Sequence, residues 1–73
     1  MSTTEELANG ELLVEVRNHV AHLTLNRPAQ LNALSFGMIS GMAELFTRWT
    51  ADDSIRAVVV RGAGEKAFCA GGD

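Results

Sequence analysis

Two adjoining segments decide the fold: Arg56-Ala-Val-Val-Val-Arg61 and, directly after it, Gly62-Ala-Gly-Glu-Lys-Ala-Phe-Cys-Ala-Gly-Gly-Asp73. The first is a β-branched run without polar alternation, which predicts a strand covered on both faces within a parallel sheet. The second holds four of the seven glycines of the chain. Bare backbone after a buried strand indicates turns through positive φ or close approach by a ligand.

The segments before this strand predict a β-hairpin. Residues 12–17 and 20–25 are rich in aliphatic and β-branched side chains, and Asn18-His19 forms a two-residue turn between them. In the second strand, alternate residues face opposite ways, so the odd-numbered positions Ala21, Leu23 and Leu25 form an apolar face. We interpret His22, on the other face, as a half-exposed strand residue rather than a proton shuttle.

An amphipathic helix is expected after Pro28, which ends the second strand. Ser35 is a suitable N-cap, and the helix should run for about four turns to residues 51–53. Strand, helix and strand then predict a right-handed crossover that places residues 20–25 parallel to 57–60. Apolar residues recur at three- and four-residue spacing and predict the core-facing side: Phe36, Ile39, Met42, Ala43, Leu45, Phe46 and Trp49. Close approach of a neighbouring backbone would explain Gly37 and Gly41.

Composition excludes several classes of protein. Apolar residues make up 47% of the 73 positions, and the net charge of −3 comes without a basic stripe, so neither nucleic acid nor an anionic membrane is an expected partner. The N-terminus lacks the features of a targeting signal, and no apolar run approaches the roughly 20 residues of a membrane span. With one cysteine, Cys69, the sequence favours a soluble, cytoplasmic protein without a disulfide or zinc site.

Three interpretations of the glycine-rich tail compete. Residues 62–67 match the dinucleotide fingerprint G-x-G-x-x-A, but Gly71-Gly72 leaves little room for the helix that must follow. Cys69 as a nucleophile would need an activating base, and its apolar neighbours favour a buried small side chain instead. The third interpretation, which we prefer, is a loop that presents main-chain N–H groups to a carbonyl oxygen that becomes an oxyanion.

The chain resembles the crotonase, or enoyl-CoA hydratase/isomerase, superfamily over nearly its whole length after residue 10. The matching pieces, in order, are Leu25-Asn-Arg-Pro28, Leu31-Asn-Ala-Leu34-Ser35, Val58-Val-Val-Arg-Gly62 and Lys66-Ala-Phe-Cys-Ala-Gly-Gly-Asp73. The resemblance implies an α/β fold in which hairpin, helix and parallel strand form the N-terminal part of a ββα superhelix. It also implies that residues 1–73 are an N-terminal fragment of a catalytic domain, truncated at the oxyanion loop.

By this resemblance, the backbone N–H of Gly72 is one of two oxyanion-hole donors, and the second comes from a helix beyond this chain. The implied ligand is coenzyme A as part of the substrate thioester, with no permanently bound cofactor and no metal. Asp73 is expected to orient the loop, and Arg27 either pairs with a phosphate or is a solvated loop residue. The residues implied to flank the coenzyme A arm are Arg27, Pro28, Ala29, Leu31, Ala70, Gly71, Gly72 and Asp73.

The reaction is less defined than the superfamily. Cys-Ala-Gly-Gly-Asp73 and Trp49 before an acidic turn resemble 3-hydroxyisobutyryl-CoA hydrolases, whereas enoyl-CoA hydratases and isomerases share much of the pattern. A non-catalytic coenzyme A-binding or assembly module is the alternative from another class. The resemblance also implies a homotrimer or a dimer of trimers for the full-length protein, and we expect residues 1–73 alone to be inactive.

Overall fold

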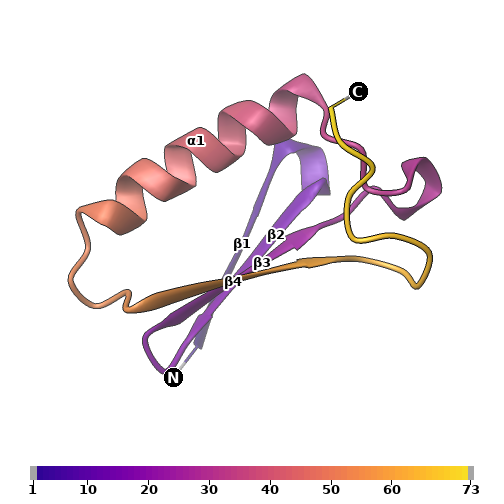
Figure 1. Ribbon diagram of the computed structural model, residues 1–73. Coiled ribbons are helices and arrows are strands. Elements are labelled where there is room, and N and C mark those ends of the chain that lie inside the picture. Colours follow the sequence, from indigo (N-terminus) through magenta and orange to yellow (C-terminus); the bar gives the residue numbers. More distant parts are fainter. Residues whose placement is uncertain (1, 73) are drawn as a thin grey trace.

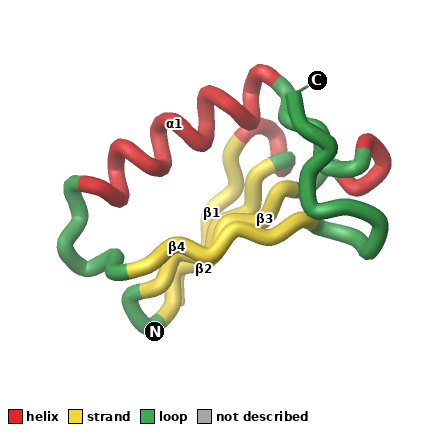
Figure 2. Tube along the Cα trace, in the orientation of Figure 1, coloured by secondary structure: helices red, strands yellow, loops and turns green. Residues whose placement is uncertain are grey.

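A computed structural model of the chain describes residues 2–72 and shows one helix lying across one face of a four-stranded sheet (Figures 1 and 2). The elements are β1 (Ser2–Leu7), a 3₁₀ turn (Ala8–Gly10), β2 (Leu12–Arg17), β3 (Val20–Leu25), a second 3₁₀ turn (Pro28–Gln30), α1 (Phe36–Thr50) and β4 (Ala57–Gly62). This mixed α/β arrangement confirms the predicted hairpin, helix and strand. β1 was not predicted, because its polar sequence lacks an apolar face.

The sheet has the strand order β1-β2-β3-β4. β1, β2 and β3 are antiparallel neighbours, and β4 pairs with β3 in parallel, with Val20 opposite Ala57 and Leu25 opposite Gly62. This register confirms the predicted parallel pairing of residues 20–25 with 57–60. The turn between β2 and β3 is the predicted two-residue turn: Asn18 and His19 have φ values of 53° and 67°, the left-handed pair that matches the twist of a hairpin.

The core lies between α1 and the face of the sheet that carries the odd-numbered residues of β3. Ala21, Leu23 and Leu25 are buried there, as the alternation predicted. The other members of this core are Leu12, Val14, Met38, Leu45 and Trp49. A Cβ on Gly41 would approach a methyl group of Leu12 to 2.7 Å, so this glycine packs closely against a side chain, whereas Gly37 has only ordinary contacts; the predicted approach of a neighbouring backbone is wrong at both glycines.

The predicted core-facing side of α1 is right for Leu45 and Trp49, which are buried, and for Met42, which packs against the core, but wrong for the residues of a second apolar row. Phe36, Ile39 and Phe46 are 85%, 49% and 41% exposed, whereas Met38, which was not predicted, is fully buried. The helix carries two neighbouring apolar rows, and the one at positions 38, 42, 45 and 49 faces the sheet. Periodicity alone could not choose between the rows, because both repeat at helical spacing.

β4 also differs from its prediction, because neither of its faces is fully covered within the described chain. Val58, Val59 and Val60 are each about 40% exposed. α1 contacts β2, and a helix about 10 Å across cannot cover four strands spaced nearly 5 Å apart. β4 is also the last strand in the sheet order, so it is an edge strand with exposed apolar side chains.

Candidate active site

The candidate site lies where two loops meet at the carboxyl ends of β3 and β4. In Figure 1 the C-terminal tail, coloured yellow, passes beside the loop that leads into α1. The backbone pairs the two: Ala70 N–H donates to Leu31 O at 3.0 Å, and Leu34 N–H donates to Gly71 O at 2.8 Å. A short parallel bridge therefore aligns Gly72 with Leu34.

The tail follows β4 without forming a helix. Residues 63–71 contain no helical turn in the structure, so the dinucleotide-fold interpretation is wrong. Gly64 and Gly71 have φ values of +79° and +101°, conformations that L side chains rarely adopt. The glycine enrichment thus reflects turns through positive φ at these two positions, as predicted.

The peptide between Gly71 and Gly72 has a defined direction. Its carbonyl oxygen faces Leu34 N–H, and no peptide bond is cis. In a planar trans peptide the N–H points opposite to the C=O. The Gly72 N–H is therefore directed away from the 31–34 segment, and it has no acceptor among residues 2–72. Gly72 is exposed, and a Cβ built on it would meet nothing within 4 Å.

The first loop, residues 27–34, contains most of the other predicted site residues. A pocket of about 390 Å³ lies between this loop and residues 63–67, with Pro28 and Leu31 in its lining. Ala29 and Ala70 are exposed, and neither lines this pocket. Asp73 lies outside the described residues. The structure thus brings Pro28 and Leu31 together at one pocket and Gly71 and Gly72 together at Leu34.

The Arg27 side chain points inward. Its Nη1 donates to Ala33 O at 2.7 Å, and its Nε lies 3.4 Å from Glu11 Oε2. Only 16% of the side chain is exposed, so the alternative of a solvated loop residue is wrong. The guanidinium has intramolecular partners here, and its pairing with a phosphate stays a prediction.

Two residues to which the sequence assigned no role hold the first loop. Glu11 accepts a 2.6 Å hydrogen bond from Ser35 Oγ, and Ser35 in turn caps α1 by accepting from Met38 N–H, as predicted for an N-cap. Asn32 is fully buried and hydrogen-bonded to both loops. Neither contact could be inferred from spacing, because each joins segments that are distant in the sequence.

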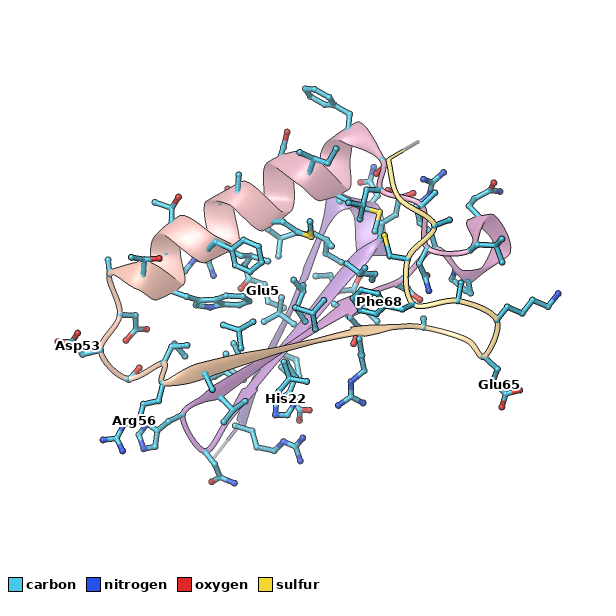
Figure 3. All side chains as sticks on the ribbon, viewed as in Figure 1. Glu5, His22, Asp53, Arg56, Glu65 and Phe68 are labelled. Carbon is cyan, nitrogen blue, oxygen red and sulfur yellow. The ribbon has the colours of Figure 1, made fainter. Side chains whose placement is uncertain are left out.

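The surroundings of two other side chains, Cys69 and His22, suit a structural role rather than a catalytic one. Cys69 is partly buried against the core, and Gly71 N–H lies 3.4 Å from its sulfur, which agrees with a packing role. His22 is half-buried on the face away from α1 (Figure 3), as predicted, with its Nε2 3.4 Å from Arg17 Nη2. A hollow of about 620 Å³ around His22 is lined by both charged and uncharged side chains and contains none of the tail.

Residues 2–72 contain no group of three His, Cys, Asp or Glu side chains that could hold a metal ion. No helix in this part of the chain is long and apolar enough to cross a membrane. The backbone pairing described above brings main-chain amides and carbonyls together next to Gly72. Amides fixed in this way can stabilise a negative oxygen but cannot transfer a proton between carbon and solvent.

Comparison with known proteins identifies relatives of this arrangement. Residues 20–73 match the family model described as enoyl-CoA hydratase/isomerase. The chain is 51% identical to 3-hydroxyisobutyryl-CoA hydrolase 1 of Arabidopsis thaliana, with 94% of this chain and 18% of that protein aligned. It is 47% identical to (E)-benzylidenesuccinyl-CoA hydratase of Thauera aromatica, over 82% of this chain and 23% of that protein.

A solved structure is similar as well. The crystal structure of a carnitinyl-CoA dehydratase from Mycobacterium thermoresistibile superposes with a TM-score of 0.82 and 52% identity, covering 86% of this chain and 18% of that one. The chain therefore spans only 18 to 23% of the length of these three proteins. With a family model matched over residues 20–73 and a shared fold, the chain belongs to the enoyl-CoA hydratase/isomerase family of the crotonase superfamily.

Proposed function

We propose that the full-length polypeptide carrying this segment is an enzyme that processes acyl-coenzyme A thioesters, with the Gly72 N–H as one oxyanion-hole donor. The observation that carries this proposal is the direction of the Gly71–Gly72 peptide. Its carbonyl is held by Leu34 N–H at 2.8 Å, and its N–H points away from that partner and has no acceptor among residues 2–72. A fixed, unengaged amide is what a developing oxyanion requires.

In the proposed mechanism, the thioester carbonyl oxygen accepts hydrogen bonds from Gly72 N–H and from a second amide outside this chain. When the carbonyl becomes an enolate or a tetrahedral oxyanion, the two amides stabilise the new charge without having to reorganise. Carboxylates outside residues 1–73 would supply general acid and base catalysis. Coenzyme A enters as part of the substrate, and no permanently bound cofactor is needed.

The coenzyme A arm is proposed to lie between the two loops. The pocket of about 390 Å³ supports this, because Pro28 and Leu31 line it together with residues 63–67. Ala29, Ala70 and Asp73 complete the proposed binding surface. Arg27 would keep the first loop in shape through its contacts with Ala33 O and Glu11. To pair with a phosphate of coenzyme A, its side chain would have to turn away from these partners.

A pair of substitutions at one position tests the oxyanion donor in the full-length enzyme. Gly72→Pro removes the N–H, and loss of one comparable donor lowers kcat by about 10²- to 10³-fold in a known hydrolase. Gly72→Ala is the matched control, because it keeps the N–H and its Cβ has open space. Steady-state kinetics should show a large loss for Gly72→Pro only. Equal activity of both variants would contradict the proposal, provided circular dichroism shows both to be folded.

For the reaction, we favour 3-hydroxyisobutyryl-CoA hydrolysis, which the 51% identity to the Arabidopsis hydrolase supports. The alternative is hydration of an enoyl-CoA, which the 47% identity to the Thauera hydratase and the 52% identity to the Mycobacterium dehydratase support. Thiol release from 3-hydroxyisobutyryl-CoA by the full-length protein is the expected result. Hydration of crotonyl-CoA without thiol release would reject the hydrolase. Coenzyme A binding without either reaction would favour a binding module.

Assembly and location are proposals as well. We propose a homotrimer or a dimer of trimers, which sedimentation equilibrium of the full-length protein would test. We also propose a cytoplasmic location, although relatives from Danio rerio and Bos taurus are named as mitochondrial. Fractionation of the source cells distinguishes the two compartments.

A further inference from the structure

Asn32 is the buried polar side chain that joins the two loops of the site. It is fully buried, and no other polar residue in the described chain falls in the buried class. Its Oδ1 accepts from Arg27 N–H at 2.9 Å, within the first loop. Its Nδ2 donates to Ala63 O and Ala67 O, both at 2.9 Å, in the loop that follows β4.

These partners fix the orientation of the amide. An N–H must face the oxygen, and two carbonyls must face the nitrogen, so the opposite orientation would leave all three contacts repulsive. Both hydrogens of Nδ2 are used. The backbone of Asn32 has φ of +57°, a left-handed conformation that asparagine tolerates better than most residues. Asparagine therefore suits both the backbone and the side-chain requirements of this position.

The geometry around Gly62 shows how closely the amide fits. A Cβ on Gly62 would lie 2.7 Å from Asn32 Nδ2 and 2.3 Å from Phe68 O. The end of β4 must be bare so that the Asn32 side chain can reach the carbonyls beyond it. Asn32 thus sits at the base of the 63–67 turn, where this turn begins and ends.

The residues near Asn32 in the first loop form backbone hydrogen bonds to the tail just before Gly72. Leu31 O accepts from Ala70 N–H, and Leu34 N–H donates to Gly71 O. The 31–34 segment therefore contacts the tail at two levels: through the Asn32 side chain at residues 63 and 67, and through its backbone at residues 70 and 71. Any shift between the two loops would move the Gly71–Gly72 peptide with it.

We propose that Asn32 is a positioning residue, whose side-chain amide sets the direction of the Gly72 N–H by fixing the tail against the 31–34 segment. This inference rests on the proposed function of Gly72 and adds a residue that does not touch the substrate. A displacement of about 1 Å in such a group costs roughly 100-fold in rate. We expect that order of loss in kcat when the Nδ2 donor is removed.

The test is Asn32→Asp in the full-length protein, with Asn26→Asp as the matched control. The first change keeps the shape and the oxygen that accepts from Arg27, but it turns the donor into an oxygen facing two carbonyls. The second makes the same chemical change at Asn26, whose Nδ2 donates to Gly10 O at 2.9 Å, in the turn between β1 and β2 rather than in the tail. Difference infrared spectroscopy of bound butyryl-CoA, labelled with ¹³C at its thioester carbonyl, reports polarisation of that carbonyl directly.

We expect the wild type and Asn26→Asp to lower the carbonyl stretching frequency of the bound thioester, and Asn32→Asp to lose most of this shift near pH 8. Burial raises the pKa of the introduced carboxyl. Its protonated form regains one donor, so the shift should partly return as the pH falls. A merely structural role would not produce this pH-dependent recovery of one spectroscopic signal.

Three results would overturn the inference, and they are distinguishable. Absence of the shift in the wild type would reject the proposed function of Gly72 itself. A full shift in folded Asn32→Asp at every pH would reject the role of Asn32 alone. If Asn32→Asp does not fold, Asn32→Ser, which leaves space for a bridging water, replaces it. Global unfolding of both would show that Asn32 serves the whole fold rather than one amide.

Discussion

The two sides of this chain differ in how completely they are closed. On one side, β2, β3 and α1 enclose a core that includes Leu12, Leu23 and Leu45, all fully buried. On the other, β4 exposes valines on both faces, and Phe68 in the tail is 58% exposed. The closed side buries its own apolar side chains. The open side, which carries the candidate site, leaves apolar side chains exposed.

Because of this difference, the candidate site is held in place by polar contacts more than by apolar packing. The tail has little apolar packing of its own, and its conformation depends on directed polar contacts from the first loop, above all those of Asn32. Since the chain spans 18 to 23% of its three described relatives, we expect the remainder of a full-length protein to cover β4 and the exposed row of α1.

The largest effect is expected in the closed core. Leu45→Ala in the full-length protein removes a fully buried side chain between α1 and the sheet. Such truncations lower the free energy of unfolding by about 2–5 kcal/mol. Thr47→Ala, an exposed position two residues away, should change it by less than about 0.5 kcal/mol. Urea denaturation measures both, and similar values for the two variants would contradict the assignment of the core face.

A smaller effect is expected where the two sides meet, at Gly62. Gly62→Ala places a methyl group 2.3 Å from Phe68 O and 2.9 Å from Ala67 O, both backbone atoms that cannot move away independently. Overpacking of this kind costs about 1–3 kcal/mol in unfolding free energy.

The matched control for Gly62 is Gly37→Ala in α1. Its Cβ would make only an ordinary 3.5 Å contact with Ala8, so the gain in helix propensity should stabilise the protein by up to about 1 kcal/mol. Opposite signs in thermal unfolding are the expected result. Stabilisation by both substitutions would mean that the tail does not pack against the end of β4.

The smallest effect concerns the ion pair that fastens β1 to α1. Arg48 donates to both carboxylate oxygens of Glu5, at 2.7 and 3.2 Å, and this hydrogen bonding lowers the pKa of Glu5. A carboxyl whose pKa is lower when folded adds stability above its unfolded pKa and loses it as the pH falls through the folded value. Because both side chains are over 40% exposed, solvent screens the pair and the effect is small.

Glu5→Gln measures this contribution. The variant should be slightly less stable than the wild type at pH 7, and the two should converge as the pH falls below the range in which Glu5 titrates. Unfolding free energies at a series of pH values provide the comparison. A difference that persists undiminished in acid would assign the effect to packing rather than to charge.

The sequence predicted the closed side better than the open one. Alternation in residues 20–25 predicted Ala21, Leu23 and Leu25 as the buried face, and the sequence predicted Ser35 as the cap of α1. The row of α1 that faces the sheet could not be chosen, because Phe36 and Met38 belong to equally regular apolar rows. That choice depends on how the helix docks, which the sequence of the helix alone does not specify.

For the site, the sequence predicted glycine-dependent turns in the tail and a main-chain donor at Gly72. It did not reveal Asn32 or Glu11, because their partners lie up to 35 residues away and become neighbours only after the sheet has formed. β1 was also missed, since Ser2–Leu7 pairs with β2 through its backbone and contributes little apolar surface.

The proposed function depends on the Gly72 amide facing the thioester carbonyl. This contact would be seen in a crystal structure of the full-length protein with a bound, unreactive acyl-coenzyme A thioester. We predict a distance of about 2.7–3.2 Å from the Gly72 nitrogen to the carbonyl oxygen. A bound thioester whose carbonyl lies elsewhere, with the Gly72 N–H donating to another group, would show that Gly72 is not an oxyanion donor.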